Sequence, residues 1–208
     1  MLLGLGDSYT SGGGKQSYPL IAANLLGWSG SNFAVPGSRM GAVSGQLAKA
    51  GSLLSNVTHV VLTTSGNDLN VKDAIMDVIL KGGFKEVEAK IWTLQPQLVS
   101  TYKIIQNAVR PGTKIFGIPY VDLISVGNKI PNEDQAHQVM QVYSNMVKAA
   151  AAEANIGFIE NVTTSFAGHE MYSADPYCTS LTESNPLHPN LKGDNKLGEV
   201  VADYLKSY

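Results

Sequence analysis

Short apolar runs alternate along the chain with longer stretches of helical periodicity. The clearest run, residues 59–64, is β-branched and typical of a strand buried on both faces. The predicted strands are 1–5, 32–35, 59–64, 114–118 and 157–160, and the predicted helices are 18–26, 42–54, 74–80, 84–109, 134–154 and 193–206. Five alternations without a break in composition predict one α/β domain over residues 1–208. We expect a three-layer α/β/α sandwich around a five-stranded parallel sheet.

Three segments of this pattern carry less regular signals. Gly45 and Gly51 weaken the helix at 42–54, and Pro96 predicts a kink within 84–109. Residues 162–192 form a loop long enough to suggest a functional element.

Composition narrows the possible classes of function. Charged residues make up 15% of the chain and the net charge is −2, without a basic stripe, so we expect no nucleic-acid partner. The single cysteine, Cys178, excludes an intramolecular disulfide and a cysteine metal cluster, and we expect a buried free thiol.

No apolar run reaches the length of a membrane span, so we expect no transmembrane segment. The first five residues are too short for a signal peptide. Two glycosylation sequons, at Asn56 and Asn161, give weak support for secretion. We expect a secreted monomer without its signal peptide here, with a cytoplasmic location as the alternative.

Small and polar residues follow the first three predicted strands. Ser8 follows the first strand within a glycine-rich loop, Gly37 follows the second, and Asn67 follows the third. Taken singly, Ser8 is a turn former and Asn67 an Asx turn or helix cap. In a parallel sheet, however, the carboxyl ends of the strands share one edge, where ligands bind.

The glycine-rich loop around Ser8 does not match any of three known glycine motifs. The phosphate loop fails because Gln16 follows Gly14-Lys15 and Tyr9 occupies the first glycine position. The dinucleotide fingerprint that begins at Gly4 also finds Tyr9 in place of its last glycine. The nucleophile elbow around Ser8 ends in Thr10, and it normally lies further along a chain.

Four histidines are present. His59 and His137 are expected to be structural or solvated, and the role of His169 is open. Proline residues flank the segment of His188, just before the last helix, and hold it in a non-helical conformation. No pair has the HExxH spacing, so no zinc site is indicated.

Taken together, these residues resemble the SGNH hydrolases, the GDSL-type esterases and lipases. The segment from Gly6 to Gly12 is similar to the first block of that family, Gly37 to the second, Asn67 to the third and His188 to the fifth. The resemblance implies a flavodoxin-like SGNH fold that needs no cofactor and no metal. It implies Ser8 as nucleophile and His188 as general base, with the Ser8 and Gly37 amides and the Asn67 side chain as the oxyanion hole.

The sequence departs from the family pattern at two positions. Ser65 replaces a glycine at the start of the third block, and Asn185 replaces the aspartate that usually orients the histidine. The tail is similar to a secreted lipase branch in which a backbone carbonyl takes that part. We therefore expect the carbonyl or side-chain oxygen of Asn185 to accept from His188, with Asp175 and Glu183 as weaker alternatives.

The implied activity is hydrolysis of a small-molecule, lipid or carbohydrate ester with a short- to medium-chain acyl group. The alternatives are a carbohydrate O-deacetylase similar to acetylxylan esterases and a non-catalytic binding module on the same scaffold.

Overall fold

The computed structural model describes residues 1–12 and 16–208 of the chain. Gly14 and Lys15, on which the phosphate-loop interpretation was tested, lie outside the described residues. A five-stranded parallel sheet occupies the centre in the order β2-β1-β3-β4-β5. Its strands are β1 (Leu2–Gly6), β2 (Gly30–Asn32), β3 (His59–Thr63), β4 (Lys114–Gly117) and β5 (Gly157–Phe158).

Strands β1 and β3 form the buried middle of the sheet. Every residue of both strands is buried, and they pair in register from Leu2 with His59 to Gly6 with Thr63. An apolar strand with helices on both faces hides both sets of side chains from water, which explains the continuous apolar run. Since both strands end at the same level, the loops that follow them meet at one edge.

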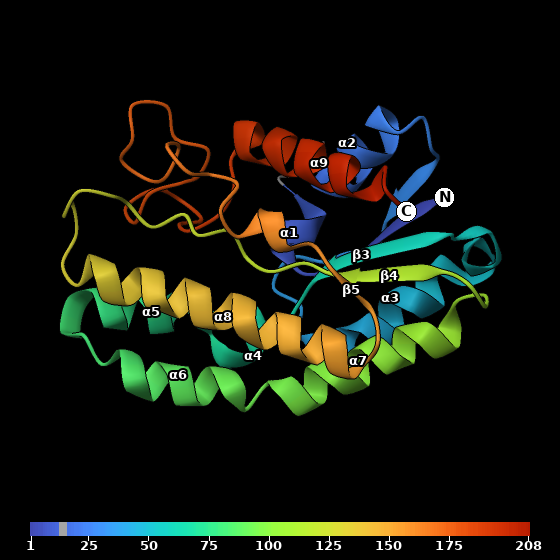
Figure 1. Cartoon of the computed structure of the whole chain (residues 1–208), viewed down its shortest axis with the longest axis horizontal. Helices are drawn as coiled ribbons and strands as arrows, with labels where there is room; N and C mark the ends of the chain where they lie inside the picture. Colours follow the sequence, from blue (N-terminus) through green and yellow to red (C-terminus); the bar gives the residue numbers. More distant parts are fainter. Residues whose placement is uncertain (13–15) are drawn as a thin grey trace.

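Helices cover both faces of the sheet, as the alternating pattern predicts. In Figure 1, α2 and α9 lie on one side, whereas α3, α7 and α8 lie on the other, and α5 and α6 pack against α8. The helices are α1 (Ser8–Ser11), α2 (Tyr18–Leu25), α3 (Val43–Ala50), α4 (Gly66–Leu69), α5 (Val71–Lys81), α6 (Phe84–Trp92), α7 (Gln95–Ala108), α8 (Glu133–Glu153) and α9 (Leu191–Leu205). Short 3₁₀ turns occupy η1 (Met40–Ala42), η2 (Gly51–Asn56) and η3 (Glu160–Val162). The three-layer α/β/α architecture is thereby confirmed.

Two predicted helices are divided in the structure. Pro96 does not kink one long helix: it lies in the first turn of α7, where a missing amide proton costs nothing, and α6 ends before it. Gly51, with φ +51°, ends α3, and the chain continues as η2.

The second strand begins earlier than predicted and ends at Asn32. The chain still follows β1 beyond that point, because the amides of Phe33 and Val35 donate to the carbonyls of Gly4 and Gly6. This irregular extension brings the next turn to the carboxyl edge of the sheet.

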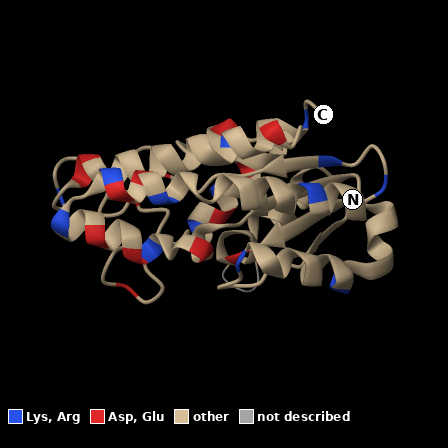
Figure 2. Ribbon diagram, turned by 90° about the horizontal axis from the view of Figure 1, so that it is seen from below, with Lys and Arg blue, Asp and Glu red and all other residues tan. Residues whose placement is uncertain are grey.

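Charged residues of both signs are interspersed over the helices on the face drawn in Figure 2, rather than gathered in one basic stripe. Within the described ranges, no helix combines the length and apolar character needed to cross a membrane.

Candidate active site

The turn after β1 fixes the backbone that leads into Ser8. Gly6 has φ +110°, and a Cβ atom there would lie 1.8 Å from the Thr63 carbonyl oxygen, so only glycine fits. The buried side chain of Gln46 bonds both the amide and the carbonyl of Gly6, at 2.7 and 2.8 Å. The Asp7 side chain then caps the short helix α1, whose first residue is Ser8. Ser8 therefore stands on a rigid turn at the carboxyl edge.

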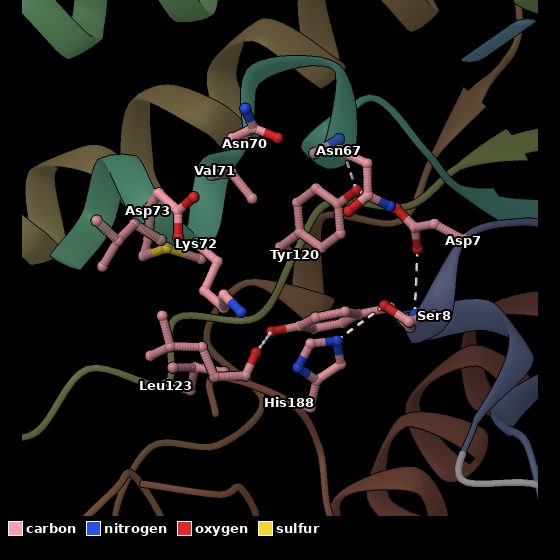
Figure 3. Close-up of a pocket in the computed structure, with 15 residues that line it drawn as sticks. Asp7, Ser8, Asn67, Asn70, Val71, Lys72, Asp73, Tyr120, Leu123 and His188 are labelled. Carbon is pink, nitrogen blue, oxygen red and sulfur yellow. Dashed lines mark hydrogen bonds between the residues drawn. The ribbon is translucent and has the colours of Figure 1, made fainter. Parts of the chain in front are cut away.

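Ser8 and His188, which are 180 positions apart in sequence, are hydrogen-bonded in the structure (Figure 3). Ser8 Oγ lies 2.8 Å from His188 Nε2, and His188 Nδ1 lies 2.8 Å from the Pro186 carbonyl oxygen. A carbonyl can only accept, so the proton of a neutral imidazole sits on Nδ1 and Nε2 is left to accept from Ser8. Burial lowers the pKa of His188, which favours this neutral form; the Pro186 carbonyl opposes that effect and the charge of Lys72 adds to it.

The segment that carries His188 is held from two sides. Thr179 pairs with it through an amide-to-carbonyl bond of 2.9 Å and a hydroxyl that accepts from the His188 amide at 3.1 Å. On the other side, Tyr9 donates its hydroxyl to the Leu187 carbonyl at 2.7 Å, and its ring packs 5.4 Å from the imidazole. The nucleophile helix itself thus supports the histidine.

The prediction that Asn185 is the hydrogen-bond partner of His188 is wrong, because that partner is the Pro186 carbonyl. The carbonyl of Asn185 accepts from the Thr179 hydroxyl at 2.8 Å instead, and its side chain is exposed. Positive φ angles at Asn185 and Leu187, +56° and +60°, turn the chain so that the intervening Pro186 carbonyl faces the imidazole.

The two acidic alternatives are engaged elsewhere. The carboxylate of Asp175 forms an ion pair with Lys192, and that of Glu183 accepts from the Ser180 amide at 2.6 Å. Neither is a hydrogen-bond partner of His188 among the described residues.

The turn after β2 and the loop after β3 face the same serine. The Ser38 amide donates to the Val35 carbonyl at 3.1 Å around Pro36-Gly37, and Gly37 has φ +76°, as in a type II turn. Asn67, in α4, donates from Nδ2 to the Ser38 carbonyl at 2.8 Å, which ties the two loops together. Ser8, Gly37, Asn67 and His188 line one cavity of about 290 Å³.

A second cavity, of about 230 Å³, also has Ser8 in its lining. Its lining includes the apolar side chains Val71, Ile75, Leu123, Met140 and Leu187 beside polar ones such as Asn70, Asp73 and Tyr120. Lys72 lines both cavities, and Figure 3 shows its ammonium group directed into the space above His188. Two cavities meeting at one serine give separate spaces for the two halves of an ester.

Asp7, which the sequence analysis gave no role, is the most deeply buried carboxylate of the site. It is 2% exposed and accepts hydrogen bonds from Tyr120, from the Thr63 hydroxyl at 2.7 Å and from the Tyr9 amide at 3.1 Å. Burial raises its pKa to about 6, against the lowering effect of these donors, of which Tyr120 is the largest.

Tyr120 and Lys72 were also missed. Tyr120 follows β4, so reading the residues after the fourth strand as well as the first three would have found it. For Lys72, at the start of α5, the sequence holds no comparable signal.

The remaining candidates lie outside the serine–histidine pair. His169 stacks on Tyr177 at 3.8 Å, and His137 bonds the Asp122 carboxylate at 2.7 Å. Cys178 is a buried free thiol, as predicted, and burial raises its pKa to about 12. The sequon residues Asn56 and Asn161 are both exposed.

The parallel sheet has the order 2-1-3-4-5, and a serine after its first strand faces a histidine before the last helix. These two features define a class of α/β ester hydrolases. The GDSL-like lipase/acylhydrolase family matches residues 5–196, and the chain belongs to that family.

Relatives of known structure agree with this assignment. The chain is 28% identical to a lipase from Streptomyces rimosus, over 92% of this chain and 81% of the relative. The crystal structure of an extracellular lipase from the same organism superposes with a TM-score of 0.81 at 26% identity, covering 99% of this chain and 98% of the other. A phospholipase A1 from Streptomyces albidoflavus shares the fold, with a TM-score of 0.77 at 20% identity and coverage of 99% and 98%. The protein is a carboxylic ester hydrolase.

Proposed function

We propose that the protein hydrolyses esters of short- to medium-chain carboxylic acids through an acyl-enzyme on Ser8. The observation that carries this proposal is the 2.8 Å contact between Ser8 Oγ and a His188 imidazole held by the Pro186 carbonyl. In the first step Ser8 Oγ attacks the acyl carbon while His188 Nε2 takes its proton. His188 then returns that proton to the departing alcohol, and a water molecule, activated the same way, releases the acid.

The tetrahedral intermediate needs donors for its oxyanion. We assign the amides of Ser8 and Gly37 and the side-chain amide of Asn67 to this task, since all three residues line the cavity beside Ser8. The Ser38 carbonyl uses one Asn67 proton and orients the group, which leaves the second proton for the substrate. Loss of one such donor costs about 10²–10³ in kcat, so we expect Asn67→Ala to fall in that range.

The cavity lined in part by Val71, Ile75, Leu123 and Met140 is assigned to the acyl chain. Its volume of about 230 Å³ is limited, which suits short and medium acyl chains. The cavity of about 290 Å³ beside Gly37 then takes the alcohol.

The decisive experiment compares Ser8→Ala and His188→Ala with the wild type on p-nitrophenyl butyrate. Both variants should lose nearly all hydrolysis, because one lacks the attacking oxygen and the other the proton acceptor. Ser11→Ala, on the same short helix, and His169→Ala, on the same long loop, are the matched controls and should retain activity. A fully active Ser8→Ala protein would refute the mechanism.

The partner of His188 is tested separately. Asn185→Ala should retain most of the activity, since the hydrogen-bond acceptor is the neighbouring Pro186 carbonyl. A loss as large as that of His188→Ala would return the orienting role to the Asn185 side chain.

The two alternatives are separated by substrate and by labelling. A carbohydrate deacetylase would prefer acetylxylan to every p-nitrophenyl ester of a chain-length series. The apolar residues in the cavity assigned to the acyl chain favour the p-nitrophenyl esters instead. A binding module would not react with a fluorophosphonate.

Because the S. rimosus relative is an extracellular lipase, we also propose that this protein is secreted.

A further inference from the structure

The hydroxyl of Tyr120 lies between the two loops that build the candidate site. It accepts a hydrogen bond from the Gly66 amide at 2.9 Å and donates one to the Asp7 carboxylate. Asp7 directly precedes Ser8, and Gly66 directly precedes Asn67. In Figure 3 the Tyr120 hydroxyl is directed toward Asp7 and the segment that carries Asn67. One oxygen atom therefore joins the loop of the nucleophile to the loop of the assigned side-chain donor.

The Tyr120 ring has little freedom to move. It is 5% exposed and packs edge-to-face against Tyr9 at 4.8 Å and against Tyr143 at 5.1 Å. Its backbone comes directly from β4, where the Ile118 amide still donates to the Leu62 carbonyl of β3. The hydroxyl is thus fixed relative to the sheet, and the two loops are held to it.

The Gly66 side of the bridge requires a residue without a side chain. A Cβ atom at position 66 would lie 2.6 Å from the Tyr120 hydroxyl oxygen, well inside contact distance. The preceding residue, Ser65, takes the left-handed φ of +87°, which few non-glycine residues adopt. Both features let the loop after β3 approach the tyrosine closely.

The Asp7 side of the bridge is equally enclosed. A buried carboxylate needs donors for its oxygens, and Thr63 and the Tyr9 amide supply Oδ1 while Tyr120 supplies Oδ2. Within the described part of the chain, no other donor reaches Oδ2. Removing the Tyr120 hydroxyl therefore leaves one Asp7 oxygen and the Gly66 amide unpaired together.

We propose that Tyr120 is a positioning residue that sets the separation between Ser8 and Asn67. This inference rests on the proposed function, because it concerns the alignment of the nucleophile with the oxyanion donors. The hydroxyl acts through Asp7 and Gly66, not on the substrate. Its loss lets the two loops shift independently, and a misplacement of about 1 Å costs up to roughly 10² in rate.

The test is Tyr120→Phe, which keeps the ring and removes only the bridging oxygen. On p-nitrophenyl butyrate we expect kcat to fall between about 10- and 100-fold, with KM within about twofold of the wild type. Labelling of Ser8 by a fluorophosphonate should slow in parallel, since the phosphonyl oxygen uses the same donors. Tyr102→Phe, which removes a hydroxyl that is equally buried but lies on α7, should leave both readouts unchanged.

A second variant addresses the same bridge from the other loop. Gly66→Ala forces the Tyr120 hydroxyl and the adjacent ring carbon away, because a Cβ atom would lie 2.6 Å from the oxygen and 2.9 Å from Cζ. It should lower kcat at least as much as Tyr120→Phe does. The double variant should lose less than the product of the two single losses, because both changes break the same hydrogen bond. Independent, multiplying losses would mean that each change only damages the fold locally and would overturn the proposal.

Two further results would overturn it. An unchanged kcat in Tyr120→Phe would show that the bridge does not align the loops, and a loss confined to KM would make Tyr120 a substrate contact. Ser8→Ala separates the failures: if that variant is inactive, only the role of Tyr120 is refuted, and if it is active, the proposed function itself fails.

Discussion

The buried carboxylate of Asp7 makes the stability of this protein depend on pH in an unusual direction. Burial raises its pKa from 3.8 to about 6, whereas in the unfolded chain it titrates at its ordinary value. Between these two pH values the folded protein holds a proton that the unfolded chain has released. The free energy of unfolding contributed by Asp7 is therefore fully present below pH 4 and declines as the pH rises through about 6.

The size of this contribution follows from the shift. The difference between 3.8 and about 6 is about two pKa units, and each unit corresponds to about 1.4 kcal/mol. From pH 4 to pH 7, Asp7 should therefore lower the stability of the wild type by between about 2 and 3 kcal/mol. Asp7→Asn removes the ionisation but keeps the shape, so the variant should lack this decline.

The assay is urea denaturation of the wild type and Asp7→Asn at pH values from 4 to 8. Circular dichroism and tryptophan fluorescence should give coincident transitions, which establishes two-state unfolding. The quantity of interest is the difference in unfolding free energy between the proteins at each pH, since all other carboxylates cancel. Asp77→Asn, which changes an exposed carboxylate on α5, is the matched control.

Two results would refute this reasoning. Parallel curves for wild type and Asp7→Asn would mean that folding does not change the affinity of Asp7 for its proton. A wild type that gains stability relative to the variant as the pH rises would mean that the hydrogen bonds from Tyr120 and Thr63 outweigh burial.

Three other predictions concern the neighbouring residues and the cavity. Lys72→Gln removes a charge that lowers the pKa of His188, so the acid limb of the kcat/KM profile should move to higher pH, while Lys81→Gln leaves it in place. Ser65→Ala should destabilise the protein by about 1 kcal/mol in urea denaturation, because the hydrogen bond to Tyr143 is lost; Ser65→Gly should cost less, since glycine relieves the left-handed strain. Across p-nitrophenyl esters, kcat/KM should be highest for short- or medium-chain acyl groups, because the cavity assigned to the acyl chain is small, and a preference for long-chain esters would refute the acyl assignment.

The alternation of apolar strands and amphipathic helices was sufficient to predict the fold. Buried strands and one-sided helices leave a local periodic signal, so the five strands were located to within a few residues. Signals that depend on context were less reliable. Proline lacks an amide proton wherever it stands. In the middle of a helix this loss bends the chain, whereas in the first turn, where Pro96 lies, it is harmless.

The relation of His188 to its partner shows a second kind of limit. The sequence indicates a non-helical segment between two prolines, but which carbonyl faces the imidazole depends on two backbone angles. Left-handed conformations at Asn185 and Leu187 rotate the Pro186 carbonyl toward Nδ1. Neither residue type requires that conformation, so the family pattern, which places the partner at Asn185, pointed to the wrong residue.

By itself, the sequence determined the α/β/α sandwich, the family blocks and the position of Ser8, Gly37, Asn67 and His188 at the ends of strands or before a helix. These features follow from local periodicity and from the rule that parallel strands share one carboxyl edge. Only the tertiary structure decided what lies between the blocks: the Pro186 carbonyl behind His188, the two cavities, and the hydroxyl that joins Asp7 to Gly66. Those contacts join segments far apart in the chain, and their distances of about 3 Å are set by packing in three dimensions, which no local pattern of residues encodes.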